Sequence, residues 1–246
     1  MRLDGNVFSG VYTMRADGSQ LVGPFEFGFY GDISPDGTRM LAYAGPRSIA
    51  IGNLLTGDTT VIPTPESLLV ELFWAPDGES IVFTGRQDSL GWNNLYTVRS
   101  DGTLHRRLTD DDASVDSPRW SPDGRRIAFS RDVPGGGGPI TLHTITPLGP
   151  DLREVAPIDC RNLPAWSPDG TGLLCSDFLG QSWIVDMETG EWRPTDGCAV
   201  WSPDGTKVIC GKQGTYIANV DGTERTAIFP GDVDASSVRW LSAEEE

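Results

Sequence analysis

The sequence contains no long apolar run. Nowhere in its 246 residues do 18 or more apolar residues follow one another, and the opening stretch Met1–Gly5 lacks the apolar region of a secretory signal. We therefore expect no membrane insertion. Localisation stays open, because the chain would be cytoplasmic if Met1 is native and periplasmic or secreted if Met1 was added to a trimmed chain.

Positive charge is scarce. Lysine and arginine together number 19 against 35 aspartates and glutamates, which gives a formal net charge of -16. Nucleic acids bind to surfaces rich in lysine and arginine, and anionic membranes attract the same side chains, so both are poor partners for this chain. Cations, basic peptides and basic protein faces remain open as partners.

The local motifs of catalysis are also missing. The two histidines, His105 and His143, have no nucleophile or metal ligand close to them in sequence. There is no G-x-S-x-G, H-E-x-x-H, phosphate-binding loop or G-x-G-x-x-G. The sequence thus predicts no catalytic residue, no metal and no cofactor, and therefore a protein that is not an enzyme.

One short turn sequence, by contrast, occurs five times. Its prolines lie 35 to 46 residues apart, and one four-stranded propeller blade takes about 40–45 residues. Proline at the second position and glycine at the fourth fit a type I turn that closes a tight hairpin. The five copies are Ser34-Pro35-Asp36-Gly37, Ala75-Pro76-Asp77-Gly78, Ser121-Pro122-Asp123-Gly124, Ser167-Pro168-Asp169-Gly170 and Ser202-Pro203-Asp204-Gly205.

Each turn stands between two expected strands, and a second hairpin follows. In residues 117–130 one strand leads into the turn and another leads out of it. Residues 95–108 then alternate apolar and polar side chains and turn at Asp101 and Gly102. Four strands per repeat result, and since no segment shows helical periodicity the expected class is all-β.

The repeat resembles that of the TolB-type β-propellers, the WD40-like family with the signature W-S-P-D-G-x-x-I-A-F, then I-Y-x-x-x-x-D-G and R-x-L-T. The resemblance covers nearly the whole chain. The sequence departs from the pattern at Ile33, where other repeats have tryptophan, and at Ala75, where they have serine. The resemblance implies a propeller fold and a binding role, although some propellers of this kind resemble lyases or cover peptidase active sites.

The two chain ends look like halves of one repeat. The signature stops after its first strand at Trp240, and residues 4–9 look like the turn and second strand that are missing there. We therefore expect a single domain over residues 1–246, a six-bladed β-propeller in which the N- and C-termini share one blade. The alternative is a fragment of a seven- or eight-bladed ring. The expected blades are residues 1–24 plus 235–246, and about 28–63, 69–109, 115–155, 160–194 and 197–229.

Both histidines have structural interpretations in the repeat. His105 follows the Asp101-Gly102 turn at the start of an outer strand, so we expect it to be exposed to solvent and alone. We expect His143 to pack in the core, because it aligns with the aromatic residues Tyr12, Tyr96, Trp183 and Tyr216.

The four cysteines have no C-x-x-C spacing, so a structural zinc site is not expected. Two of them replace phenylalanines of other repeats as small apolar core residues. In the expected register Cys198 lies opposite Cys210, close enough for a disulfide. We favour free buried thiols, but the sequence does not decide the disulfide state of Cys160, Cys175, Cys198 and Cys210.

Two acidic clusters invite a calcium interpretation. They are residues 110–112 with Asp116, and Asp232 with Asp234. Neither has the D-x-[DN]-x-[DN]-G spacing and distant glutamate of a calcium-binding loop. We interpret both as solvated loops and keep calcium as the weaker alternative.

The long, irregular segments all fall on one face of the predicted propeller, opposite the short hairpin turns. Variable loops on a rigid scaffold are where binding residues usually lie. We expect the rings of Trp92 and Phe178 to anchor a partner there; in the alternative interpretation they cap their own blades. The candidate binding residues are Arg86, Asp88, Trp92, Asn93, Asp132, Phe178 and Gln181.

Three functions fit these observations. The first is a non-catalytic binding module that recognises a protein or peptide on the long-loop face or in the central channel. The second is a propeller accessory to an enzyme, or a propeller enzyme of lyase or hydrolase type. The third is a structural ring that assembles with other domains or with copies of itself. We favour the first.

Overall fold

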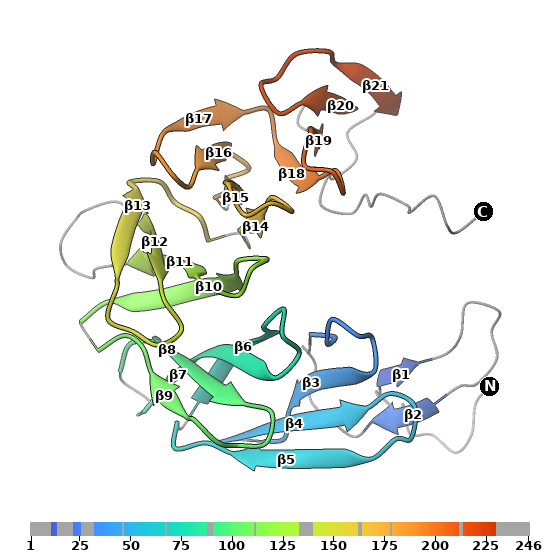
Figure 1. The fold of residues 1–246 in the computed structure, drawn as a ribbon, viewed down its shortest axis with the longest axis vertical. Coiled ribbons are helices and arrows are strands. Elements are labelled where there is room, and N and C mark those ends of the chain that lie inside the picture. Colours follow the sequence, from blue (N-terminus) through green and yellow to red (C-terminus); the bar gives the residue numbers. More distant parts are fainter. Residues whose placement is uncertain are drawn as a thin grey trace. The chain divides into compact units, whose positions relative to one another are not determined.

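The described part of the chain consists of β-strands joined by turns and loops (Figure 1). The computed structural model describes residues 11–13, 22–25, 32–45, 47–66, 68–87, 91–110, 112–132, 140–161, 164–177, 179–211 and 214–229. These residues include no helix, and thus none long and apolar enough to cross a membrane. They belong to two compact units, Met1–Gly91 with Tyr96–Arg106, and Trp92–Leu95 with Arg107–Glu246.

The N-terminal half of the chain forms three antiparallel sheets. The first sheet pairs only two strands, β1 (Val11–Thr13) and β2 (Val22–Phe25). The second has three, β3 (Arg39–Tyr43), β4 (Ser48–Asn53) and β5 (Thr59–Pro63), and a single bridge from Ile33 to Met40 replaces its first strand. The third has four in chain order, β6 (Leu68–Trp74), β7 (Ser80–Arg86), β8 (Asn94–Arg99) and β9 (Arg106–Arg107).

Three further sheets, each of four strands in chain order, follow in the second unit. The first contains β10 (Ser114–Trp120), β11 (Ile127–Asp132), β12 (Thr141–Ile145) and β13 (Arg153–Ala156). The next contains β14 (Ala165–Trp166), β15 (Gly172–Ser176), β16 (Ser182–Asp186) and β17 (Trp192–Thr195). The last contains β18 (Cys198–Trp201), β19 (Lys207–Cys210), β20 (Thr215–Asn219) and β21 (Thr226–Phe229).

The described sheets confirm the prediction of an all-β chain, and four of the six have the four strands expected for a repeat. In such an up-and-down sheet, the first and third turns lie at one end, which we call the hairpin end. The other end, which we call the long-loop end, carries the second turn and the connection between sheets. The terminal segments 1–10 and 230–246, on which the predicted shared blade depends, lie outside the described residues.

The repeated turn has the same hydrogen bonds in four of its five copies. In Ser202-Pro203-Asp204-Gly205 the Ser202 hydroxyl donates to Asp204 Oδ1 over 2.6 Å and accepts from the Lys207 N–H over 2.9 Å. Gly205 N–H donates to Ser202 O, and glycine takes the left-handed conformation with φ of 72°. Ala75 cannot make the serine contacts, and there the Ser80 hydroxyl donates to Asp77 Oδ2 instead.

These turns predict acid sensitivity. The hydroxyl bonds from Ser34 and Ser202, with those of the following threonines, lower the pKa of Asp36 and Asp204 from 3.8 to about 2. A pKa that is lower in the folded state than in the unfolded state stabilises the fold above the unfolded value, and the stabilisation is lost as pH falls through the folded one. We expect the urea midpoint to drop between about pH 4 and pH 2, and Ser202→Ala to flatten that drop. An unchanged profile in the variant would contradict this.

Apolar side chains pack between neighbouring sheets. Leu41 and Ile49 of β3 and β4 form one core with Ile81 and Phe83 of β7. In the second unit, residues of β11 to β13 pack against β15 and β16, and residues of β15 and β16 pack against β18 and β19. Within each unit, neighbouring sheets therefore bury their faces against each other, as propeller blades do.

Rings of the second and third strands face each other across the repeat. The Phe83 and Tyr96 rings stack with centroids 5.2 Å apart, and those of Phe129 and His143 lie 6.0 Å apart. His143 is 5% exposed, so the prediction that it packs in the core is confirmed. In the last two sheets cysteines replace the phenylalanines, and Cys175 faces Trp183 while Cys210 faces Tyr216.

All four cysteines form disulfides, so the preference for free thiols was wrong. Cys198 bonds to Cys210, which lies opposite it in the register between β18 and β19. Cys160 bonds to Cys175, and this pair was not predicted. In both sheets a disulfide from the second strand takes the place of the stacked ring pair. The disulfide from Cys210 leads to the first strand of its sheet, and the one from Cys175 leads to the segment before the first strand.

Two of the signature tryptophans, Trp166 and Trp201, bond to the sheet before their own, whereas the indole N–H groups of Trp74 and Trp120 have no partner among the described residues. In the second unit, the indole N–H of Trp166 donates to Arg119 O over 3.2 Å, and that of Trp201 donates to Ala165 O over 2.9 Å. Both acceptors directly precede the signature tryptophan of the previous sheet. Isoleucine at position 33 cannot donate such a bond, and the Trp74 backbone N–H of the next sheet bonds to the Asp32 carboxylate.

Candidate binding site

The structure describes five of the seven predicted binding residues. Trp92 is 44% exposed in the loop between β7 and β8, and Asn93 beside it is partly buried. Arg86 ends β7 and Asp132 ends β11, both partly buried, and Gln181 is exposed before β16. The remaining two, Asp88 and Phe178, lie outside the described residues.

Hydrogen bonds fix the backbone beneath Trp92. The Asn94 side-chain amide donates to Trp92 O over 3.1 Å, and the Val115 N–H donates to Asn93 O over 3.0 Å. The Asn93 amide also donates to Asp116 Oδ1 over 3.1 Å. The indole is therefore presented to solvent on an ordered base, which disfavours the alternative that Trp92 folds back to cap its blade.

A charged cluster lies at the long-loop end of the second unit. The Arg161 guanidinium binds Asp159 through both Nε and Nη2, with Nη2 2.8 Å from Oδ2. These bonds, followed by the charges of Asp159, Asp132 and Asp116, raise the pKa of Arg161. The cluster brings the predicted residues Asn93 and Asp132 together through partners that the sequence analysis missed. The Asp159-Cys160-Arg161 sequence in an inter-blade segment was the available signal.

His105 is not exposed and alone, so that prediction was wrong. Its Nε2 lies 3.2 Å from Oε2 of Glu66, whose side chain is fully buried. The imidazole also lies against the rings of Phe83 and Tyr96, with centroids 5.9 and 5.8 Å away. The error arose because Glu66 belongs to the segment before β6, 39 residues away, and turn alignment cannot show such a neighbour.

Two cavities of the second unit lie at its hairpin end, between sheets. One of about 800 Å³ separates β14–β17 from β18–β21, and one of about 470 Å³ lies at the equivalent position between β10–β13 and β14–β17. Trp201 lines the larger cavity and Trp166 the smaller. None of the predicted binding residues lines either cavity.

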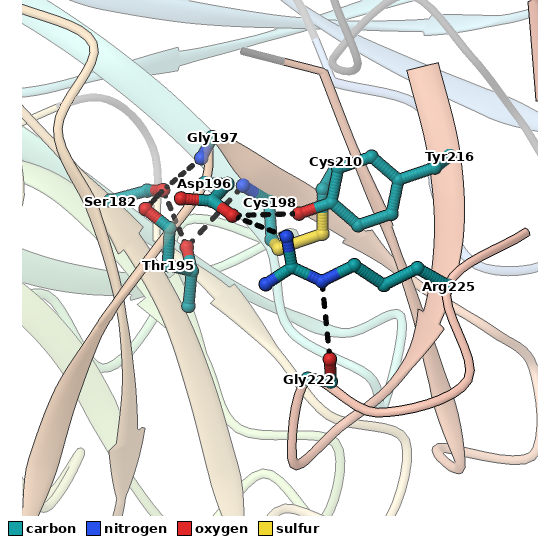
Figure 2. Close-up of a disulfide and its surroundings, with 9 residues drawn as sticks. All are labelled: Ser182, Thr195, Asp196, Gly197, Cys198, Cys210, Tyr216, Gly222 and Arg225. Carbon is teal, nitrogen blue, oxygen red and sulfur yellow. Dashed lines mark hydrogen bonds and ion pairs between the residues drawn. A yellow bond between two sulfur atoms is a disulfide. The ribbon is translucent and has the colours of Figure 1, made fainter. Parts of the chain in front are cut away.

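A smaller cavity of about 150 Å³ borders the Cys198–Cys210 disulfide. Figure 2 shows Asp196 beside the disulfide, with its carboxylate joined by dashed lines to Tyr216 and Arg225. Asp196 Oδ2 accepts from the Tyr216 hydroxyl over 3.3 Å and from Arg225 Nη1 over 2.8 Å. The Arg225 guanidinium also lies over the Tyr216 ring, 5.1 Å from its centroid. The Tyr216 hydroxyl and the Arg225 guanidinium are thus both bonded to Asp196.

The acidic cluster at residues 110–116 is dispersed. Asp110 pairs with Arg107 over 2.7 Å, and Asp116 accepts from Asn93. Residue 111, Asp232 and Asp234 lie outside the described residues. In the part of the chain that is described, no three histidine, cysteine, aspartate or glutamate side chains gather in a way that could hold a metal ion.

Comparison by sequence finds curated relatives but no matching family model. The chain is 33% identical over 133 residues to a protein TolB homolog of Chlorobium luteolum, covering 50% of this chain and 28% of that one. It is 31% identical over 125 residues to the uncharacterized peptidase YuxL of Bacillus subtilis, covering 46% and 18%. It is 35% identical over 104 residues to dipeptidyl-peptidase 5 of Porphyromonas endodontalis, covering 39% and 15%. The matched part of the chain thus spans less than a third of the length of each of these three relatives.

These relatives overturn the prediction that the chain is not an enzyme. Two of the three are named as peptidases, and the solved structures with this fold include an oligogalacturonate lyase in complex with manganese. The prediction failed because it rested on motifs that are local in sequence. A propeller can instead bring distant residues together, or belong to a chain whose catalytic residues lie elsewhere. Among the described residues, no cluster of side chains fits a manganese ion.

Comparison by structure supports the fold. TolB from Acinetobacter baumannii superposes with a TM-score of 0.58 at 20% identity, over 76% of this chain and 49% of that one. The oligogalacturonate lyase superposes with a TM-score of 0.61 at 15% identity, over 75% and 61%. At such identities the likeness concerns the fold alone. Taken with the five signature turns and the similarity to a TolB homolog, it supports a TolB-type β-propeller fold for this chain.

Proposed function

We propose that this chain binds a protein partner at the long-loop end of its blades. The observation that carries the proposal is the exposed indole of Trp92 on a backbone fixed by hydrogen bonds. Rigidly held tryptophan and arginine side chains supply much of the energy of protein interfaces. The Arg161–Asp159 pair and Asp132 lie in the same unit at the same end, where they would form the polar rim of such an interface.

The proposal includes a closed ring of six blades. It rests on the sheet β1–β2, for which two strands are found among the described residues, where the later sheets of the chain have four. Residues 235–246 would contribute the first strand of that blade and residues 1–10 its second. A closed ring would hold the long-loop ends of all blades on one face, so that Trp92 and the charged cluster would address one partner.

Replacement of Trp92 tests the binding site. We expect Trp92→Ala to weaken partner binding about tenfold or more, as hot-spot residues do. Because the side chain is half exposed, the melting temperature should change little. The partner is first captured on immobilised protein, identified by mass spectrometry and purified, and its dissociation constant is then measured by calorimetry.

Trp192→Ala is the matched control for this experiment. Trp192 is 45% exposed, as Trp92 is 44% exposed, but it lies at the hairpin end. The control should retain wild-type affinity for the partner. Equal affinities of the wild type and Trp92→Ala would remove the long-loop end as the binding site.

A part in peptide hydrolysis is the second candidate function. The observation that favours it is the sequence similarity to two proteins named as peptidases, which extends over 46% and 39% of this chain. A propeller that binds a polypeptide would fit both functions. Release of 4-nitroaniline from dipeptidyl-4-nitroanilide substrates tests this candidate directly. Absence of turnover by the purified chain would leave partner binding as the function of this part.

A further inference from the structure

A second surface with the properties of a binding site is the groove of about 800 Å³ between β14–β17 and β18–β21. One wall is the Trp201 indole, whose N–H is bonded to Ala165 O over 2.9 Å. A Cβ atom placed on Gly172 would lie 3.0 Å from this ring. The ring is therefore held directly against the Gly172 backbone, and this wall of the groove is preformed.

The opposite wall carries an exposed aromatic ring. Trp192 is the first residue of β17 and is 45% exposed. Tryptophan is the side chain that attracts a cation most strongly through its ring face. An exposed indole on a mixed polar and apolar groove is a feature of binding sites rather than of a solvated turn.

The groove is also strongly anionic. Its lining includes the four acidic residues Asp169, Asp186, Glu191 and Asp221. Hydrogen bonds within the turns lower the pKa of three of them, from the Ser167 hydroxyl to Asp169, from the Thr189 N–H to Asp186 and from the Thr223 hydroxyl to Asp221. These three are ionised at neutral pH.

Arg193 is the one basic residue among those that line the groove. Within the described part of the chain its guanidinium makes no hydrogen bond or ion pair, although it lies near enough to Asp221 to help lower the pKa of that carboxyl. Its N–H donors therefore remain available. In a peptide whose side chains are cationic, the backbone carbonyl oxygens are the groups that could accept a hydrogen bond from Arg193.

We propose that this groove binds a basic peptide segment. A lysine or arginine side chain of the segment lies against Trp192 among the carboxylates, and a peptide carbonyl accepts a hydrogen bond from Arg193. Charge complementarity selects this ligand, because the groove has four acidic residues and one basic residue. The site lies at the hairpin end, opposite the proposed partner site at Trp92, and does not depend on it.

The probe is the peptide N-acetyl-Lys-Lys-Lys-amide, titrated into the whole chain at low salt in a calorimeter. We expect saturable binding, weakened about fivefold by Trp192→Ala and by Asp221→Asn, since a fivefold change corresponds to the ~1 kcal/mol of one such contact. Added salt should weaken the binding. The peptide N-acetyl-Glu-Glu-Glu-amide should not bind.

Two matched controls separate this site from the general negative charge of the chain. Asp101 has the same turn as Asp221, with Oδ1 accepting the N–H and hydroxyl of a threonine two residues on, in a different sheet. Asp101→Asn and Trp92→Ala should therefore leave the affinity unchanged. Equal losses in Asp101→Asn and Asp221→Asn would overturn the proposal, as would no binding of the lysine peptide. A loss in Trp92→Ala alone would move the ligand to the long-loop end.

Discussion

Replacing His105 by alanine is expected to lower the free energy of unfolding by about 1–3 kcal/mol, the usual effect of leaving a buried polar group without its hydrogen-bond partner. The Glu66 side chain is fully buried, and its Oε2 lies 3.2 Å from His105 Nε2. Its Oε1 has no hydrogen-bond partner among the described residues. Without the imidazole, the carboxyl group would remain in the core without a hydrogen-bond partner. Urea denaturation followed by tryptophan fluorescence measures the loss.

The double variant Glu66→Leu with His105→Leu provides the test of this explanation. Replacing both members of a buried pair by apolar residues is often neutral, so the double variant should recover most of the stability. Arg99→Ala is the control, because Arg99 forms an exposed pair with Glu79 at 3.3 Å and should cost less than about 1 kcal/mol. A loss in His105→Ala no larger than in Arg99→Ala would show that Glu66 does not need the imidazole.

Reduction of the disulfides is expected to destabilise the second unit by about 2–4 kcal/mol for each bridge. The bridges close segments with sequence separations of 15 and 12 residues. Breaking them returns conformational freedom mainly to the unfolded chain. The measurement is the urea midpoint with and without a reductant, with thiol titration to confirm that four thiols have formed.

Two double variants measure how much each disulfide contributes to stability. Cys160→Ala with Cys175→Ala removes one bridge, and Cys198→Ala with Cys210→Ala removes the other. Each pair should lose part of the stability, and the chain lacking all four cysteines should no longer respond to the reductant. A wild-type midpoint that is unchanged after complete reduction would show that the bridges do not stabilise the fold.

The repeat made most of the fold predictable, because its turn chemistry is local. Serine, proline, aspartate and glycine at fixed positions define the turn and the register of the strands beside it. The facing of Cys198 and Cys210 followed from that register and is confirmed. The core position of His143 followed from alignment with aromatic residues and is also confirmed.

The features that escaped prediction are those that join different repeats or lie outside them. Cys160 belongs to a segment between sheets that has no counterpart in the turn alignment, so its bond to Cys175 could not be foreseen. Glu66 lies in another such segment. The groove beside Trp201 has residues of two repeats on its walls. For the same reason the sequence analysis placed candidate residues on long loops alone.

The tryptophan bonds between sheets run in one direction along the chain. Trp201 donates to the sheet of Trp166, and Trp166 donates to the sheet of Trp120. Among the described residues, the indole N–H groups of Trp74 and Trp120 have no hydrogen-bond partner, so this bond links the last three sheets alone. Each link takes its donor from one sheet and its acceptor from the sheet before. Loss of one tryptophan would therefore weaken the contact with the preceding sheet and leave the bond to the following sheet intact.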